Sequence, residues 1–310
     1  MEGPLPVTLV TGFLGAGKTT LLNGLLAAAS PLRIGVLQNE RGPAGLDAPP
    51  TAALTRVEIA DGCACCVRNP DLVAAAQELA ARGDLDRVLF ETSGLADPLP
   101  LTWTLARWDL AEKVRVDAVV TVVDVLNFAG CRGEEWSAQV AAADLVVFAK
   151  SELAGEVARR AAEDEVAREN PRARRLLASA ADVLPRLLLE REPAAPRPAG
   201  FGRSASDRRH GSGFAEVAIT GPEAYRLERL EDFLESLPGE VFRAKGLVRV
   251  EDGRWARFHA VGGRVQVEPD VPPPSHDDSR LVFFGRGLTD SGLRVPLRRA
   301  QQRPGRSLPR

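Results

Sequence analysis

Short, almost continuously apolar runs alternate with longer amphipathic runs over the first 190 residues of this chain. Apolar runs such as 119–123 and 145–148 are typical of strands that are buried on both faces of a parallel sheet. The amphipathic runs at 19–29, 71–81 and 156–169 predict helices. Strands are predicted at 5–11, 33–38, 55–59, 87–92, 118–124, 145–149 and 173–178. This alternation indicates an α/β fold with a doubly wound, mainly parallel sheet, which we expect to fill residues 1–191.

The pattern changes after that point. Residues 192–213 are rich in proline, glycine and serine and show no periodicity, so we interpret them as a flexible linker. Residues 214–290 follow as a smaller α+β domain. Residues 291–310 are rich in arginine, and we interpret them as a disordered, solvated tail rather than an anion-binding arm. Within the smaller domain, strands are predicted at 214–220, 241–250, 254–261, 264–268 and 280–285, and a helix at 223–237.

Composition adds limits to this picture. Apolar residues make up 45% and charged residues 26% of the 310 residues, as in ordinary globular proteins. A formal net charge of -2 gives no global attraction to nucleic acid or to an anionic membrane, so we expect neither as a partner. The apolar start of the chain lacks the basic region of a signal peptide, and no uncharged apolar run is long enough for a membrane span. We therefore expect a cytoplasmic protein.

The strongest local signal is the stretch GFLGAGKT at 12–19, which fits G-x-x-x-x-G-K-[ST] between a predicted strand and a predicted helix. In such a P-loop the backbone N–H groups surround phosphate oxygens, and the helix N-terminus favours their negative charge. Lys18 would reach the β- and γ-phosphates, and the Thr19 hydroxyl would ligate Mg²⁺. The other expected nucleotide-binding residues of this stretch are Gly12, Gly15, Ala16, Gly17 and Thr20.

Two downstream strand ends offer carboxylates that would complete this site. Glu91 follows one apolar strand and would hold Mg²⁺ through water, while the N–H of nearby Gly94 would sense a γ-phosphate. Asp124 follows another strand in the same way. A carboxylate at such a place is often a helix cap. Beside a P-loop we favour the metal role for Glu91 and leave both interpretations open for Asp124.

A second signal is the cysteine cluster Cys63, Cys65 and Cys66, which holds three of the four cysteines. Thiolates favour zinc or copper(I) and accept cobalt or nickel. Three ligands leave a tetrahedral site with an open position, which suits catalysis or transfer better than a closed structural site. The alternative is three buried or redox-active cysteines. Glu40 would add an oxygen ligand, face the nucleotide, or be a solvated loop residue.

The remaining candidate metal ligands are weaker. Cys131 stands alone, and we interpret it as a small buried residue. His259 alternates with two polar or large residues on a predicted strand, so we place it at the surface. The other two histidines lie in the linker and in a loop.

Taken in order, these motifs resemble those of the CobW-type family of metallochaperone GTPases, relatives of the urease and hydrogenase accessory GTPases. The resemblance extends to about residue 288. It implies a GTPase domain with a small C-terminal domain, Zn²⁺ or Co²⁺ at the cysteine motif, and Glu91 at the place where other GTPases carry a switch aspartate. The matching stretches are GFLGAGKTTLLNGLL at 12–26, NERG at 39–42, GCACC at 62–66, ETSGLADPLP at 91–100, Gln139 with Ala143-Asp144, FRAKGLVRV at 242–250 and VGG at 261–263.

The chain departs from this family at the guanine-reading motif, which is usually Asn-Lys-x-Asp or Thr-Lys-x-Asp. Here the aligned residues are Ala149, Lys150, Ser151 and Glu152. Glu152 can accept the same pair of hydrogen bonds as aspartate but is one methylene longer, whereas Ala149 cannot replace the asparagine. The resemblance, rather than these residues, therefore implies GTP as the nucleotide, with Lys150 and Glu152 contacting the base.

These observations predict a GTP-hydrolysing metallochaperone that uses Mg²⁺ and carries zinc, or alternatively cobalt, to a client metalloprotein. Assembly into a homo-oligomer stays open. A P-loop kinase for a small molecule and a non-enzymatic metal-sensing protein are the alternatives of other classes.

Overall fold

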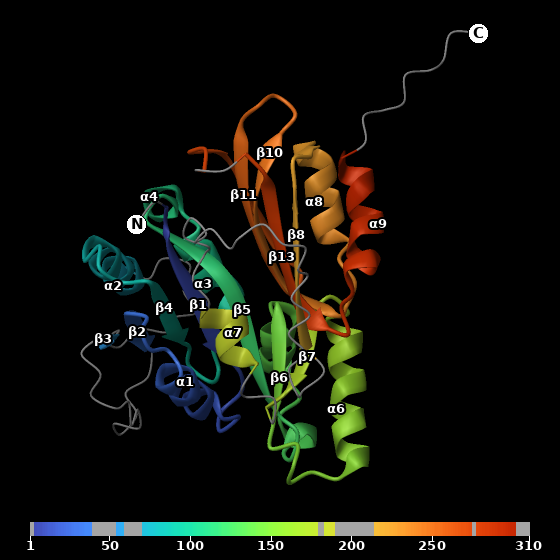
Figure 1. Cartoon of the computed structure of the whole chain (residues 1–310). Coiled ribbons are helices and arrows are strands. Elements are labelled where there is room, and N and C mark those ends of the chain that lie inside the picture. The colour runs from blue at the N-terminus through green and yellow to red at the C-terminus, as the bar shows by residue number, and fades with distance from the viewer. Residues whose placement is uncertain are drawn as a thin grey trace. The chain divides into compact units, whose positions relative to one another are not determined.

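The structure is a computed structural model that describes residues 3–38, 54–58, 70–178, 183–189, 214–274 and 277–301 (Figure 1). The chain divides into two compact units between Glu190 and Arg191, at the start of the proline-rich segment. The cysteine cluster, Glu40 and the whole of the predicted linker lie outside the described residues.

Seven described strands of the first unit form one sheet in the order β3-β2-β4-β1-β5-β6-β7, and every neighbouring pair is parallel (Figure 1). The order reverses at β1, as in a doubly wound fold, so ligands are expected at the carboxyl ends of the central strands. The strands are β1 (Leu5–Thr11), β2 (Ile34–Gln38), β3 (Leu54–Glu58), β4 (Arg87–Glu91), β5 (Val114–Asp124), β6 (Leu145–Ala149) and β7 (Arg174–Leu177).

Helices connect these strands and bury apolar faces against the sheet. Leu9, Phe90 and Val119 of the central strands pack in one cluster with Leu72 and Leu101 from two of the helices. The helices of the first unit are α1 (Lys18–Ala27), α2 (Pro70–Ala81), α3 (Pro98–Leu105), α4 (Trp108–Ala111), α5 (Glu134–Ala141), α6 (Glu156–Glu169) and α7 (Leu184–Leu189), with a 3-10 turn η1 (Phe128–Gly130). The predicted mainly parallel α/β sheet is therefore confirmed.

Strand β5 begins four residues before its predicted start, and the buried charged residue in this extension has a partner of opposite charge. Asp117 is 1% exposed, and the guanidinium of Arg87 on β4 donates to its carboxylate and, at 3.1 Å, to Thr8 on β1. The opposite charges compensate one another inside the sheet. The apolar pattern alone did not reveal this cross-strand pair.

The second unit is an antiparallel sheet in the order β12-β11-β10-β13-β8, with β9 pairing parallel to β10. Two helices cover one face of this sheet with apolar side chains, so the predicted smaller α+β domain is confirmed. The elements are β8 (Phe214–Gly221), β9 (Ala224–Tyr225), α8 (Leu227–Glu235), β10 (Val241–Val250), β11 (Trp255–Val261), β12 (Arg264–Val271), β13 (Ser279–Arg286) and α9 (Asp290–Gln301).

Two predictions for this unit are wrong. Residues 291–301 of the supposed disordered tail belong to α9, because Leu293, Leu297 and Ala300 recur at helical spacing among the arginines and are buried in the core. Residues 302–310 lie outside the described part. His259, predicted at the surface, is only 4% exposed.

Candidate nucleotide site

The stretch between β1 and α1 has the backbone of a phosphate-binding loop. Gly12 has φ 139°, and a Cβ atom there would lie 2.3 Å from the carbonyl oxygen of Val122 on β5, so only glycine fits. Gly15 and Gly17 also have positive φ values, and Ala16 donates its N–H to the carbonyl of Phe13 at 3.1 Å. The turn therefore leads directly into the N-terminus of α1, where Thr20 is exposed.

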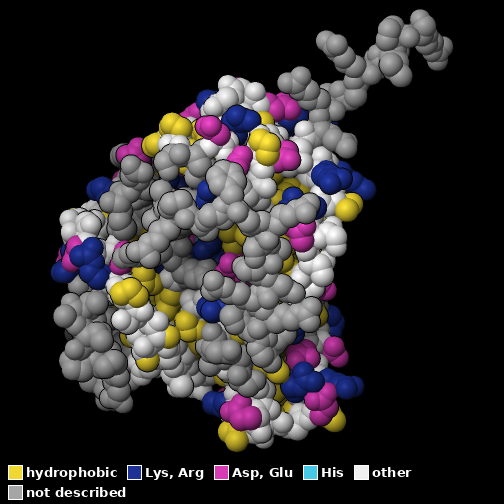
Figure 2. Space-filling view, viewed as in Figure 1, with side chains coloured by type: hydrophobic (Ala, Val, Ile, Leu, Met, Phe, Trp, Pro, Cys, Tyr) yellow, Lys and Arg dark blue, Asp and Glu magenta, His cyan; other side chains and the backbone are white. Residues whose placement is uncertain are grey.

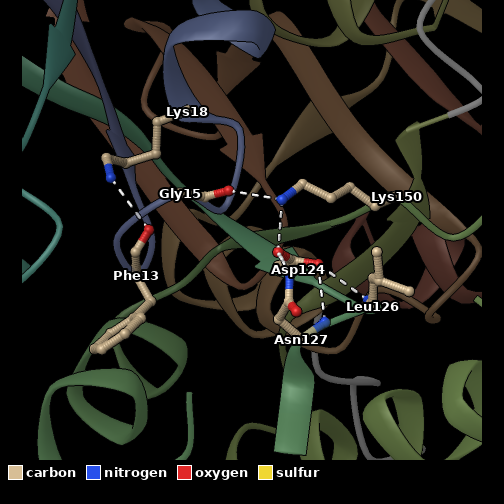
Figure 3. Close-up of polar contacts among 7 residues, drawn as sticks. All are labelled: Phe13, Gly15, Lys18, Asp124, Leu126, Asn127 and Lys150. Atoms are coloured by element: carbon tan, nitrogen blue, oxygen red, sulfur yellow. Dashed lines mark hydrogen bonds and ion pairs between the residues drawn. The ribbon is translucent and has the colours of Figure 1, made fainter. Parts of the chain in front are cut away.

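Lys18 lies within this loop rather than in solvent. Its side chain is buried, and its Nζ donates to the carbonyl of Gly12 at 3.0 Å. It also donates to the carbonyl of Phe13 at 3.3 Å (Figure 3). The ammonium group is thus held at the mouth of the loop, where it can exchange carbonyl oxygens for phosphate oxygens. The sequence motif predicts that this group reaches the β- and γ-phosphates of a nucleotide.

Glu91 at the end of β4 is joined to α1 and to β2. Its Oε1 accepts the hydroxyl of Thr19 at 2.6 Å, and its Oε2 accepts the side-chain amide of Gln38 at 3.0 Å. A hydroxyl and a carboxylate are hard oxygen ligands, which Mg²⁺ prefers, either directly or through its waters. The two side chains would therefore suit a magnesium ion beside the phosphate loop, where they would supply a hydroxyl and a carboxylate oxygen.

Gln38 was not among the residues predicted for the site, whereas Glu40 was. Gln38 is the register partner of Glu91 in the neighbouring parallel strand, since β2 and β4 pair directly. One signal for Gln38 was available in the sequence. Gln38 is a polar residue at the end of an apolar strand that lies beside another apolar strand. Glu40 lies outside the described residues.

The turn after β4, residues 93–97, closely approaches the phosphate loop. Thr92 donates its hydroxyl to that of Thr11 at 2.9 Å and its N–H to the Val10 carbonyl at 3.0 Å, which fixes the start of the turn against the end of β1. A Cβ atom at Gly94 would lie 2.5 Å from the Leu14 side chain and 2.8 Å from its backbone nitrogen, so glycine permits this close approach. The predicted γ-phosphate sensor is thus in contact with the P-loop.

Asp124, for which two roles stood open, organises the loop after β5. Its Oδ1 accepts the backbone N–H groups of Leu126 and Asn127, and its Oδ2 accepts Nζ of Lys150 at 2.7 Å (Figure 3). Burial would raise the pKa of Asp124, but the hydrogen bonds from Lys150 and Asn127 outweigh it and lower the pKa. Asp124 is therefore a carboxylate that caps its own turn and holds Lys150.

Lys150 connects the base-reading motif to the phosphate loop. It has a positive φ of 57° and also donates from Nζ to the carbonyl of Gly15 at 2.9 Å (Figure 3). Ala149 before it is half-buried, and Glu152 two residues later is exposed. The large side chains of Leu126 and Leu153, near Asp124 and Lys150 in sequence, are 50% and 66% exposed.

The structure does not test the predicted metal ligands. Within the described residues no group of three His, Cys, Asp or Glu side chains is arranged to hold a metal ion. Cys131 is partly buried; burial, followed by the nearby Asp124 carboxylate, raises the pKa of its thiol. A neutral thiol is a poor metal ligand, so Cys131 belongs with the packing of its cluster.

The surface charge and the composition of the described helices add little evidence about possible partners. On the described part of the face in Figure 2, basic and acidic side chains are interspersed, which matches the formal net charge of -2. Among the described helices, none has both the length and the apolar character that a membrane span requires.

Comparisons with known proteins identify several relatives of this chain. The chain is similar to the zinc chaperone CobW of Pseudomonas aeruginosa, with 47% identity over 132 residues, which are 39% of this chain and 35% of that protein. It is also similar to the zinc chaperone CobW of a Sinorhizobium species, with 34% identity over 55% of this chain and 58% of that protein. Each match thus spans less than two thirds of the relative's length. The zinc chaperone YjiA of Escherichia coli is 29% identical over 94% of this chain and 97% of that protein.

Family matches cover both units. The CobW C-terminal domain family matches residues 214–301, which include α9 up to its last residue. The nucleotide-binding domain family matches residues 6–176, which is more than half of the chain and includes the phosphate loop, Glu91 and Lys150. The chain belongs to the CobW/HypB/UreG nucleotide-binding family.

Proposed function

We propose that this chain is a Mg²⁺-dependent GTPase whose hydrolysis cycle controls the delivery of zinc to a client metalloprotein. The observation that carries the nucleotide part is the contact of Thr19 with Glu91 directly behind a P-loop. This contact brings the Thr19 hydroxyl, the Glu91 carboxylate and the Gly94 turn to one edge of the sheet. Lys18 neutralises developing charge on the transferred phosphoryl group, and Lys150 and Glu152 contact the base.

Zinc is the cargo, and Cys63, Cys65 and Cys66 hold it. Two observations support zinc as the cargo and the three cysteines as its ligands. Relatives of the chain are named zinc chaperones, which favours zinc over cobalt. The cysteines also lie in the segment between the end of β3 and the start of α2. Strand β3 runs parallel to β2, so this segment starts at the same sheet edge as the phosphate loop.

A client must contact the protein to receive the metal. Leu95, Leu99 and Trp103 are each 42–56% exposed, on the 93–97 turn and on α3 that follows it. Leu99 and Trp103 are four residues apart and share one helix face. Exposed apolar side chains beside a nucleotide-dependent turn are suited to a protein partner whose binding follows the nucleotide state.

The experiment is a zinc competition titration against a chromophoric chelator, with GTP analogue, with GDP and without nucleotide. Coupled sites should differ in zinc affinity by roughly 5–150-fold between nucleotide states. The triple variant Cys63→Ser, Cys65→Ser, Cys66→Ser should lose the zinc site. The matched control Cys131→Ser removes a neutral thiol and should keep it.

Two outcomes would overturn the proposal. Equal zinc affinities in all three states would leave a GTPase with an uncoupled metal site. Transfer of phosphate to a small-molecule acceptor rather than to water would instead identify a kinase. A product assay for inorganic phosphate, run on the same samples, separates these possibilities.

A further inference from the structure

Gln139 on α5 is fully buried and binds the turn that follows β4. Its side-chain Nε2 donates to the carbonyl of Gly94 at 3.0 Å and to the carbonyl of Ala96 at 3.2 Å. Its exposed fraction is 0%. Both N–H bonds of the amide are therefore used on a turn 43 and 45 residues away in sequence.

The orientation of this amide follows from its surroundings. Two carbonyl oxygens face it, and only the NH₂ end can donate to both of them. Rotating the amide would place its oxygen against these two acceptors, which would be repulsive. Its Oε1 has no hydrogen-bond partner among the described residues. A buried acceptor without a donor is unfavourable, so an arrangement of the turn that supplied an N–H would gain free energy.

Gln139 is itself fixed to the sheet. Thr121 on β5 donates its hydroxyl to the backbone carbonyl of Gln139 at 2.7 Å. On the other side of the turn, Gly94 lies against Leu14 of the phosphate loop. Because the peptide unit is planar and trans, holding the Gly94 carbonyl toward Gln139 directs the N–H of Leu95 away from it. Gln139 thus sets which backbone groups the turn presents to the phosphate loop.

We propose that Gln139 is a positioning residue that sets the geometry of the 93–97 turn and thereby determines how strongly the protein distinguishes a γ-phosphate from its absence. This inference rests on the proposed nucleotide function and goes beyond it, because it names a residue that touches neither nucleotide nor metal. The P-loop itself should bind GDP with or without this amide.

The test uses two variants in the full chain. Gln139→Glu keeps the shape but replaces two donors by acceptors, and Gln139→Met keeps the length without polarity. Both should bind a fluorescent GDP analogue like the parent protein. They should bind a GTP analogue more weakly and so lose the preference for it over GDP, and kcat/KM for GTP should fall roughly 10- to 100-fold, as expected for a misplaced reacting group.

Asn170 offers a matched control. Its buried Nδ2 donates to the carbonyls of Val140, Ala141 and Ala143 at the end of α5, which is the same kind of amide clamp away from the turn. Asn170→Asp should lower thermal stability without changing the ratio of GTP-analogue to GDP affinity. An equal change of this ratio in the Asn170 and Gln139 variants would reduce Gln139 to a structural role and overturn the proposal.

A measurement on the unaltered protein keeps the proposal testable if the Gln139 variants do not fold. In ¹⁵N-labelled protein, the side-chain amide protons of Gln139 should be protected from exchange and should shift when GDP is replaced by a GTP analogue. Unchanged resonances would contradict the proposal. If hydrolysis is absent in the parent protein, the proposed GTPase activity fails, but the affinity ratio and these resonances still test Gln139.

Discussion

The hydroxyl of Thr19 at the start of α1 donates to the carboxylate of Glu91 at the end of β4 over 2.6 Å. The same carboxylate accepts the amide of Gln38 at the end of β2. The ends of β2 and β4 and the start of α1 thus meet at Glu91, which is 53 residues from Gln38 and 72 residues from Thr19 in sequence. A carboxylate held by two donors in this way is oriented before any metal arrives.

Replacement of this acid tests its assigned role. Glu91→Gln keeps the shape but removes the charge, and its amide would oppose the donor of Gln38. We expect Mg²⁺-dependent GTP hydrolysis to fall on the order of 100-fold, because the metal would be misplaced without the Glu91 carboxylate. Hydrolysis rates over a magnesium titration measure this. A variant with the parent rate and magnesium dependence would show that Glu91 serves only the fold.

Lys18 gives a prediction for binding rather than for chemistry. Lys18→Ala removes the cation that lies against the Gly12 and Phe13 carbonyls, so both GTP and GDP affinity should be lost in calorimetric titration. The exposed Lys113 is a control, since Lys113→Ala removes a similar charge from the surface of the same domain. Unchanged GTP affinity in Lys18→Ala would contradict the assignment of the phosphate loop.

The base-reading motif predicts weak discrimination between GTP and ATP. Ala149 lacks the amide of the usual asparagine, and Glu152 is longer than the usual aspartate. The double variant Ala149→Asn, Glu152→Asp should therefore raise the ratio of GTP to ATP affinity. Competition between the two nucleotides in both proteins measures it. If the parent protein already rejects ATP as strongly as the double variant, another part of the pocket reads the base.

The sequence predicted those parts of the site that a local pattern determines. The phosphate loop follows from spacing within eight residues, and Glu91 follows from an apolar strand that ends in an acid. Gln38 and Gln139 could not be placed in this way, because their contacts join residues 53 and 43–45 positions apart. Side-chain amides carry no periodic signal, and only the strand order determines which amide meets which carboxylate or carbonyl.

The same reasoning explains the error in the C-terminal segment. Its arginine content resembles that of a solvated tail, while the three apolar residues that define α9 are outnumbered by charges. Burial of Leu293, Leu297 and Ala300 depends on a sheet face formed by residues up to 83 positions earlier, the distance from Val217 to Ala300. Composition therefore described the exposed side of the helix and missed its buried side.

Helix α9 should accordingly contribute to the stability of the second unit. Leu297 is 1% exposed, so Leu297→Ala should lower the free energy of unfolding by about 2–5 kcal/mol. The neighbouring Arg298 is exposed, and Arg298→Ala should change it by less than about 0.5 kcal/mol. Chemical denaturation of the full chain measures both. Equal stability of the two variants would show that α9 is dispensable for the fold.

Tyr225 should make the free energy of unfolding depend on pH in the alkaline range. Tyr225 is the single tyrosine of the chain and is 1% exposed. Burial raises its pKa from 10.0 to about 12, against the smaller opposing effect of the hydrogen bond from Gln301. The unfolded chain therefore loses this proton first as pH rises, so stability falls from about pH 10 until the folded state also ionises near pH 12.

The full loss amounts to roughly 2–3 kcal/mol for a shift of two units. The measurement is direct, because near-ultraviolet absorbance of tyrosinate reports this one side chain. Tyr225→Phe should remove the part of the pH dependence that belongs to Tyr225, while the titration of lysines stays in both proteins. Two results would contradict this prediction: a tyrosinate transition of the folded protein near pH 10, or an identical alkaline stability profile in the phenylalanine variant. Either result would show that water reaches the Tyr225 hydroxyl despite its contact with Gln301.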